Sequence, residues 1–124
     1  MDLTKFFQSM KKLLIVLLVS ISTLSCEKDN LIPKKDIPDW LKENIKGLEQ
    51  EIEADPTTYL AYCYWVRFEW KNNFYFEFIN PISSSFPIPK GMNGELLSIH
   101  TDPLYSEYPI EKCCMRYVWK GQKQ

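Results

Sequence analysis

Residues 59–79 read YLAYCYWVRFEWKNNFYFEFI, and this stretch decides the fold. Aromatic and β-branched residues, which favour strands, lie on both sides of the polar segment Lys71-Asn72-Asn73. The stretch therefore predicts a β-hairpin. We expect a three-residue loop over 71–73 with Asn73 left-handed, because a two-residue Asn-Asn loop would place Phe68 opposite Glu77 and mix apolar with charged side chains.

The three-residue loop assigns the hairpin side chains to two faces. One face pairs apolar residues with one another: Trp70 with Phe74, Phe68 with Phe76, and Val66 with Phe78. The other face pairs Arg67 with Glu77 and Glu69 with Tyr75, and the same alternation adds Trp65 and Ile79. This second face is predicted to bind a protein or a glycan, with four candidate residues: Trp65, Arg67, Tyr75 and Glu77. The alternative is that loop 81–92 or the C-terminal tail covers it.

A helix is predicted directly before the hairpin, over residues 36–54. Pro38 suits its first turn, and Asp55-Pro56 ends the pattern. The apolar residues of this segment recur every three or four positions: Leu41, Ile45, Leu48 and Ile52. Such spacing gives one narrow apolar stripe that must pack on another element, and the aromatic hairpin is the nearest one in the sequence.

The segment after the hairpin predicts loops and short strands. Residues 81–92 carry three prolines and predict an irregular loop, while Asn93-Gly94 marks a turn into a short strand over 95–100. Residues 101–109 predict another loop, and the alternation over 111–120 predicts a final strand. The sequence therefore predicts an α+β domain, with one N-terminal helix packed on a small antiparallel sheet of three to four strands.

The N-terminus has the order of a secretory signal: Lys11-Lys12, then an apolar run over 13–19, then Leu24-Ser25-Cys26. The apolar run is far shorter than the ~20 residues of a membrane-spanning helix. The cleavage region resembles a lipobox, which predicts removal of residues 1–25 and lipidation of Cys26. Residues 26–36 are then a flexible tether and 37–124 a small α+β domain. An ordinary secreted protein with Cys26 free and an uncleaved membrane anchor are the alternatives, and the true start is either Met1 or Met10.

Lipidation of Cys26 leaves three cysteines: Cys63, Cys113 and Cys114. An oxidising compartment favours one disulfide and one remaining thiol. Strand alternation places Cys63 and Cys114 on outer faces, so we predict a Cys63–Cys114 bridge, with Cys113 as the alternative partner. Three free thiols, or a Cys113–Cys114 bridge acting as a redox switch, stay open.

Few residues point to catalysis. His100 is the only histidine, and we expect it in a turn or on the surface, while Glu49 and Glu53 are expected on the solvated face of the helix. The four glycines are dispersed, so no phosphate-binding loop is predicted. Removal of residues 1–25 leaves 12 basic and 15 acidic residues, which gives no reason to expect nucleic-acid binding. We predict no enzyme, metal site or cofactor, with a thiol redox protein as the enzymatic alternative.

The chain resembles a family of small Bacteroidota lipoproteins of unknown function over residues 38–99. Five motifs carry the resemblance: Trp40-Leu41, Ile45, Phe68-Glu69-Trp70-Lys71, Phe74-Tyr75-Phe76 and Asn93-Gly94-Glu95-Leu96-Leu97. The family pattern has a Cys-Cys pair after the second strand, where this chain has Ser83-Ser84-Ser85. The resemblance implies export and architecture but no activity.

These patterns together predict a lipoprotein, anchored by palmitate-type acyl chains to a membrane of the cell envelope and acting as a non-enzymatic binding module. The outer membrane is the expected location, with the domain facing the periplasm or the cell surface. The alternative function is a small enzyme inhibitor, because cystatin-like and β-lactamase-inhibitor-like domains also combine a helix, a sheet and protruding loops.

Overall fold

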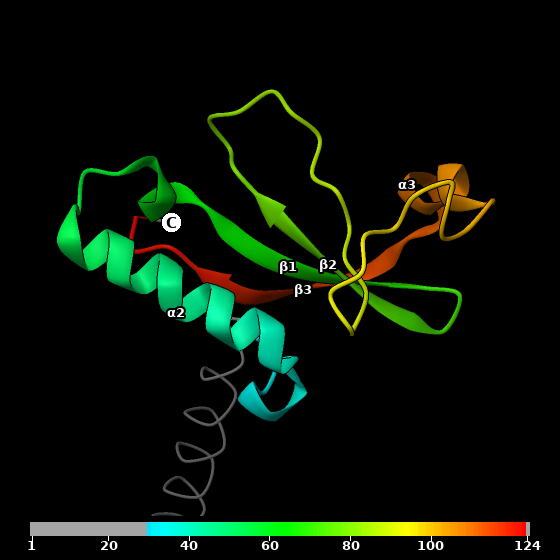
Figure 1. Ribbon diagram of the computed structural model, residues 1–124, viewed down its shortest axis with the longest axis horizontal. Helices are drawn as coiled ribbons and strands as arrows, with labels where there is room; N and C mark the ends of the chain where they lie inside the picture. Colours follow the sequence, from blue (N-terminus) through cyan, green and yellow to red (C-terminus); the bar gives the residue numbers. More distant parts are fainter. Residues whose placement is uncertain (1–29, 124) are drawn as a thin grey trace, which may run out of the picture. The chain divides into compact units, whose positions relative to one another are not determined.

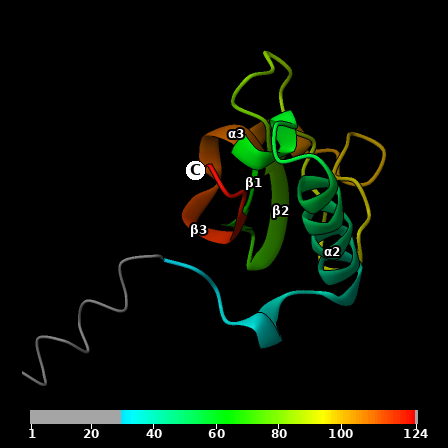
Figure 2. The same ribbon diagram turned by 90° about the vertical axis from the view of Figure 1, so that its left-hand side faces the viewer.

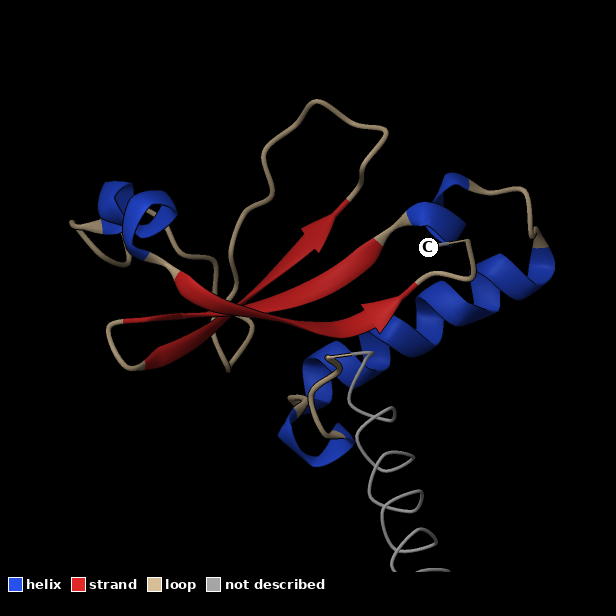
Figure 3. Ribbon diagram, turned by 180° about the vertical axis from the view of Figure 1, so that it is seen from behind, coloured by secondary structure: helices blue, strands red, loops and turns tan. Residues whose placement is uncertain are grey.

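The computed structural model describes residues 30–123, so the predicted signal segment and Cys26 lie outside the described residues. Three strands form one antiparallel sheet in the order β2-β1-β3 (Figure 3). This arrangement confirms the predicted α+β class. The elements are η2 (Lys34–Asp36), α2 (Asp39–Ala54), η3 (Tyr59–Tyr62), β1 (Tyr64–Trp70), β2 (Asn73–Ile79), η4 (Tyr105–Glu107), α3 (Tyr108–Glu111) and β3 (Cys113–Lys120).

Helix α2 covers one face of the sheet (Figure 2). It begins after Pro38, whose backbone is extended, and it ends at Ala54. The next residue, Asp55, accepts hydrogen bonds through its carboxylate from the backbone and hydroxyl of Thr57. Leu41 and Ile52 are fully buried, which confirms the predicted apolar stripe. The stripe packs on a core that contains four aromatic side chains of the sheet: Trp65, Phe76, Phe78 and Trp119.

Indole hydrogen bonds fix the helix on the sheet. Trp65 donates through Nε1 to Oδ1 of Asn44 at 3.0 Å, and Trp119 donates to Oε1 of Glu49 at 3.2 Å. Both acceptors are on α2, so the two strand residues hold the helix at points more than one turn apart. A buried tryptophan needs such a partner for its N–H, and here the partner also sets the position of the helix.

The hairpin loop has two residues, Lys71 and Asn72, with φ angles of 49° and 62°. Phe68 therefore pairs with Tyr75, and Trp70 pairs with Asn73. The predicted three-residue loop with a left-handed Asn73 is wrong by one position. Two successive left-handed residues make the turn whose twist matches that of paired strands.

The prediction chose the hairpin register that gives one apolar and one polar face. This criterion fails because both faces of the sheet are covered. Trp65 faces α2 and is 4% exposed. On the opposite face, Phe68 and Tyr75 pack against a cluster that includes Leu97 and Tyr108. Leu97 and Tyr108 cover this face around Phe68 and Tyr75, whereas the covering segments considered from the sequence were loop 81–92 and the C-terminal tail.

Residues 95–100 do not form the predicted strand. Leu96 makes one isolated bridge to Lys90, which itself pairs with Phe76 at the edge of β2. The hydroxyl of Thr101 accepts from the backbone N–H of Ser98 and closes a turn at that point. Side chain and backbone therefore bond locally here, and the sheet has three strands.

The domain begins earlier than the predicted boundary at residue 37. Leu31 pairs with Tyr117 of β3, and the N–H of Ile32 donates to the carbonyl of Tyr117 at 2.9 Å. Ile32 is buried in the core beside Leu41. The stretch 31–36 thus belongs to the domain and not to a tether. Within residues 30–123, no helix has the length and apolar character needed to cross a membrane.

Candidate functional site

The cysteines do not pair as predicted. The carbonyl of Cys63 accepts from the N–H of Gly121, just beyond β3, whereas Cys113 at the start of β3 pairs with Glu69. Since Glu69 lies six residues beyond Cys63, Cys63 and Cys114 are about 20 Å apart along the sheet. A disulfide needs Cα atoms within about 7 Å. The Cys63–Cys114 bridge is therefore wrong.

The structure joins Cys113 to Cys114 and leaves Cys63 free and buried. The thiol of Cys63 is 3.5 Å from the carbonyl oxygen of Tyr59, to which it donates. Burial raises the pKa of the Cys63 thiol, which keeps it protonated. Cys63 thus acts as a small apolar side chain of the core, packed with Ile52 and Leu60.

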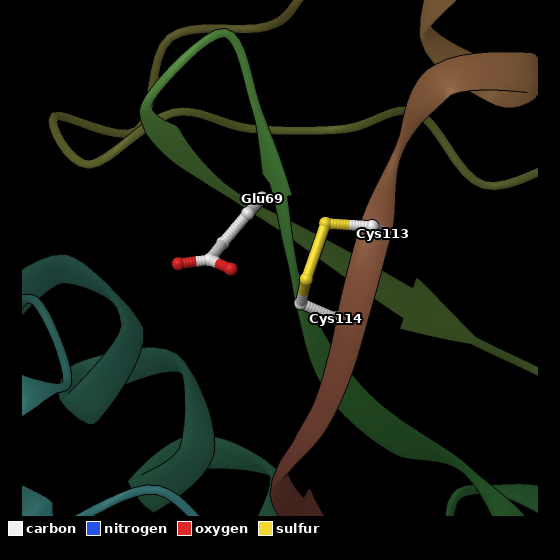
Figure 4. Close-up of side chains that lie close together, drawn as sticks. All are labelled: Glu69, Cys113 and Cys114. Carbon is white, nitrogen blue, oxygen red and sulfur yellow. A yellow bond between two sulfur atoms is a disulfide. The ribbon is translucent and has the colours of Figure 1, made fainter.

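A backbone irregularity brings the two bonded sulfurs to one side of β3. Successive side chains of a regular strand point to opposite faces. Cys114 instead has a left-handed backbone, with φ of 65°, where the pairing of β1 with β3 shifts register between Arg67 and Glu69. The carboxylate of Glu69 lies beside the sulfurs (Figure 4), and one ligand atom from each residue lies within 4.8 Å of the others. We call Glu69, Cys113 and Cys114 the cysteine cluster.

The cysteine cluster borders an open pocket of about 370 Å³. Cys113 and Glu69 line it, and Glu111 lines it from α3 while accepting a hydrogen bond from Nε1 of Trp70 at 2.9 Å. Lys71 also lines the pocket, with its ammonium 4.3 Å from the centre of a Trp70 ring. Both cysteines are exposed, so solvent and reagents reach the sulfurs.

A second concave site lies between β2, the segment that follows it and α3. It has a volume of about 360 Å³, within the range of small-ligand pockets, and its lining is mainly apolar. We call it the apolar pocket; the residues that line it are Glu77, Phe86, Pro87, Ile88, Pro89, Leu97, Tyr105, Tyr108, Pro109 and Lys112.

The polar groups of the apolar pocket bond to one another. Glu77 is 2% exposed, and its Oε2 accepts from the Tyr108 hydroxyl at 2.6 Å and from Nζ of Lys112 at 2.9 Å. Burial, together with the hydrogen bond to Glu77, raises the pKa of Tyr108 well above its ordinary value. The tyrosine therefore stays protonated, and the three groups form a satisfied buried network.

Large apolar side chains are exposed on the segments that border the apolar pocket. Phe86 is 94% exposed and Ile110 is 86% exposed. Ile82 and Ile88 are also exposed, on the segment after β2 that extends away from the sheet (Figure 1). We call Ile82, Phe86, Ile88 and Ile110 the apolar rim. Phe86 and Ile88 also line the apolar pocket, and exposed apolar side chains at a pocket are typical of interaction sites.

The predicted binding face is not one surface. Trp65 and Arg67 lie on the face that α2 covers, whereas Tyr75 and Glu77 lie on the opposite face. Three of the four are buried, so the prediction is wrong. Arg67 packs its guanidinium 4.0 Å from the centre of the Phe74 ring, and its Nε has no hydrogen-bond partner among the described residues. Burial and the nearby Arg116 lower the pKa of Arg67.

Two other predictions are confirmed. His100 is exposed in a turn, and Glu49 and Glu53 are exposed on α2. Ile82, Phe86 and Ile88 of the apolar rim were missed because they lie in a segment predicted only as an irregular loop, and Ile110 because it falls between a predicted loop and the predicted final strand. The available signal was the recurrence of Ile82, Phe86 and Ile88 among serines and prolines, where a solvated loop needs no large apolar residues.

Comparisons of the chain with protein-family models, with curated proteins and with solved structures find no match. The resemblance to small lipoproteins therefore stays a prediction.

Proposed function

We propose that this chain is a membrane-anchored lipoprotein whose domain binds a protein of the cell envelope through the apolar pocket and the apolar rim. The observation that carries the proposal is the 94% exposure of Phe86 beside a pocket with an apolar lining. Exposed aromatic side chains around a concave site are typical anchors of protein interfaces. The partner is expected to offer an apolar segment that fills the pocket and receives Phe86.

The chemistry of the pocket supports binding rather than catalysis. A general acid or base needs a pKa near the working pH and a free position toward the substrate. Tyr108 has a strongly raised pKa, and Glu77 already accepts from both Tyr108 and Lys112. These groups are suited to holding β2 and the α3 segment together as the walls of a fixed pocket.

The anchoring part of the proposal rests on the sequence before residue 30. Lys11-Lys12, the apolar run over 13–19 and Cys26 support export and lipidation. Among the described residues, Leu31 is the first that pairs with the sheet, and the five Cα–Cα steps from Cys26 to Leu31 span at most about 18 Å. An acyl chain on Cys26 would then keep the domain near the membrane surface, where an envelope partner is within reach.

Two experiments test the two parts separately. Labelled palmitate should be incorporated into the native chain and not into Cys26→Ala. Equal labelling of both would contradict the proposed lipid anchor at Cys26. For binding, a photo-crosslinking residue placed at position 86 should join the chain reproducibly to an apolar segment of one envelope protein.

The matched control for binding is position 99. Ile99 is 61% exposed, similar to Ile88 at 60%, but it does not line the apolar pocket. The double variant Phe86→Ser, Ile110→Ser should abolish the crosslink to the partner from a nearby position, while Ile99→Ser should leave it unchanged. Equal crosslinking from positions 86 and 99 would contradict the assignment of the site.

The alternative function is a small enzyme inhibitor. The observation in its favour is the protruding segment after β2, which carries Phe86 at 94% exposure (Figure 1). An inhibitor of this type would insert the segment into an enzyme cleft. A screen against cysteine peptidases and β-lactamases separates the two functions, because inhibition that is lost in Phe86→Ser supports this alternative.

A further inference from the structure

We propose that the cysteine cluster is a redox-gated binding site for a thiophilic divalent cation of the zinc class. The cluster brings two sulfurs and one carboxylate to the same side of β3, and their ligand atoms lie within 4.8 Å of one another (Figure 4). Adjacent side chains of a regular strand point to opposite faces, which would separate the two sulfurs. The left-handed backbone of Cys114 removes that objection.

The donor set selects the cation. Two thiolates favour a soft or borderline ion, and a single carboxylate is too little for calcium or magnesium, which take several oxygen ligands. Zinc binds sulfur at about 2.3 Å and carboxylate oxygen at about 2.0–2.2 Å. Ligand atoms of one tetrahedral ion are then about 3.5 Å apart, so binding needs the two sulfurs to separate to that distance once the disulfide is reduced and the Glu69 carboxylate to approach them by about 1 Å.

The surroundings permit that closure. Glu69 is only partly buried and lines the open pocket, so its carboxylate has room to move. Three protein ligands leave a fourth tetrahedral position for water, and two of the three, Glu69 and Cys113, line the open pocket. Lys71 lines the same pocket and offsets part of the negative charge of two thiolates and a carboxylate around a divalent cation.

The disulfide makes binding dependent on redox state. Reduction by a dithiol transfers two electrons and two protons to the sulfurs, giving two thiols and the disulfide of the reductant. The cation then displaces both thiol protons and forms two metal–sulfur bonds. An oxidant of the disulfide class reverses this: it takes two electrons from the two thiolates, the Cys113–Cys114 bond forms again, and the cation and two thiolates of the oxidant are released.

The site does not depend on the proposed partner binding, since the cysteine cluster shares no residue with the apolar pocket. Failure of either proposal leaves the other standing. The test uses the full chain carrying Cys26→Ser and Cys63→Ser, so that Cys113 and Cys114 are the only thiols. Reduction with a phosphine avoids a competing thiol, and Cd²⁺ serves as the probe because thiolate binding gives an ultraviolet charge-transfer band.

The reduced chain should titrate to one Cd²⁺ per chain, Zn²⁺ should displace it, and the oxidised chain should bind neither ion. Glu69→Gln should weaken Zn²⁺ binding about 10-fold or more, the scale seen when even an indirect partner of a metal ligand is removed. Glu95→Gln, which changes an exposed carboxylate outside the cluster, should leave the affinity unchanged. Addition of a disulfide oxidant to the loaded chain should release the ion.

Three results would overturn the proposal. The first is binding by the reduced chain no tighter than by Cys113→Ser, Cys114→Ser in the same background. The second is an unchanged affinity in Glu69→Gln, and the third is one ion per two chains. Near-ultraviolet circular dichroism of the reduced chain is the folding control. Loss of its signal also counts against the proposal, because the site would not exist in the only state able to bind.

Discussion

Replacing Glu77 is the most direct test of the buried network that it forms with Tyr108 and Lys112. Its carboxylate is buried and holds two donors, the Tyr108 hydroxyl and the Lys112 ammonium. Glu77→Ala leaves both donors without their acceptor. An unpaired buried hydroxyl costs about 1–3 kcal/mol, and a broken buried ion pair costs about 3–5 kcal/mol.

The solvent exposure of Lys112 decides how much stability Glu77→Ala loses. Its side chain keeps 24% of its surface in solvent, against 3% for Glu77, so the ammonium regains part of its hydration when the carboxylate is lost. We therefore expect Glu77→Ala to lower the free energy of unfolding by about 3 kcal/mol, near the low end of the ion-pair range. In a domain of this size that loss lowers Tm by about 12–24 °C.

Urea unfolding measures the loss as a lower midpoint at unchanged m-value. Glu77→Gln keeps an oxygen acceptor for Tyr108 and should lose only about 1 kcal/mol. Glu77→Leu combined with Lys112→Met and Tyr108→Phe replaces all three bonded groups by apolar ones and should recover most of the loss. A loss in Glu77→Ala smaller than about 0.5 kcal/mol, the range of ordinary surface changes, would refute the buried network.

Three further predictions concern pH, close packing and the hairpin loop. Because the pKa of Tyr108 is raised in the folded state, the stability it contributes is complete below the ordinary value of 10.0 and falls above it by up to about 1.4 kcal/mol per pH unit. Tyr108→Phe should reduce this slope, and Tyr64 and Tyr75, whose pKa values are also raised, account for the remainder. Gly47 in α2 has open space where a Cβ would lie, so Gly47→Ala should raise the free energy of unfolding by about 0.5–1 kcal/mol. In Gly121→Ala the new Cβ would collide with the backbone of η3 and should lower that free energy by about 1–3 kcal/mol, so thermal unfolding should shift Tm in opposite directions. Replacing Lys71-Asn72 by Asn-Gly suits two left-handed residues and should raise Tm, and a fall in Tm would indicate the three-residue loop instead.

The helix was predictable because its evidence is local. Pro38, Asp55-Pro56 and the apolar spacing from Leu41 to Ile52 act within the segment itself. The hairpin was predictable for the same reason, from strand-forming residues around a polar turn. Its register was not, since the choice assumed one buried face. With α2 on one face and Tyr108 on the other, both registers bury aromatic side chains, and the turn conformation decides.

The Cys113–Cys114 disulfide was not predictable because it also depends on strand register. Alternation assigns Cys113 and Cys114 to opposite faces only while β3 pairs regularly with β1. The register shifts between Trp65 and Val66 and again between Arg67 and Glu69, and each shift inverts the assignment of faces beyond it. Nothing in the sequence of either strand alone marks these positions, because a bulge depends on both partners.

Residues 108–113 contribute to both the apolar pocket and the cysteine cluster, and their conformation was not predictable from the sequence. Residues 101–109 were predicted as a loop and 111–120 as a strand, which leaves no role for the turn between them. In the structure this turn is α3 followed by Lys112. Tyr108 and Lys112 bond Glu77 in the apolar pocket, while Glu111 bonds Trp70 beside the cysteine cluster. A four-residue helix has no amphipathic period to detect, since it is shorter than two turns. Its position follows from the buried carboxylate and the buried indole that its side chains must satisfy, and these partners lie 31 and 41 residues earlier in the chain.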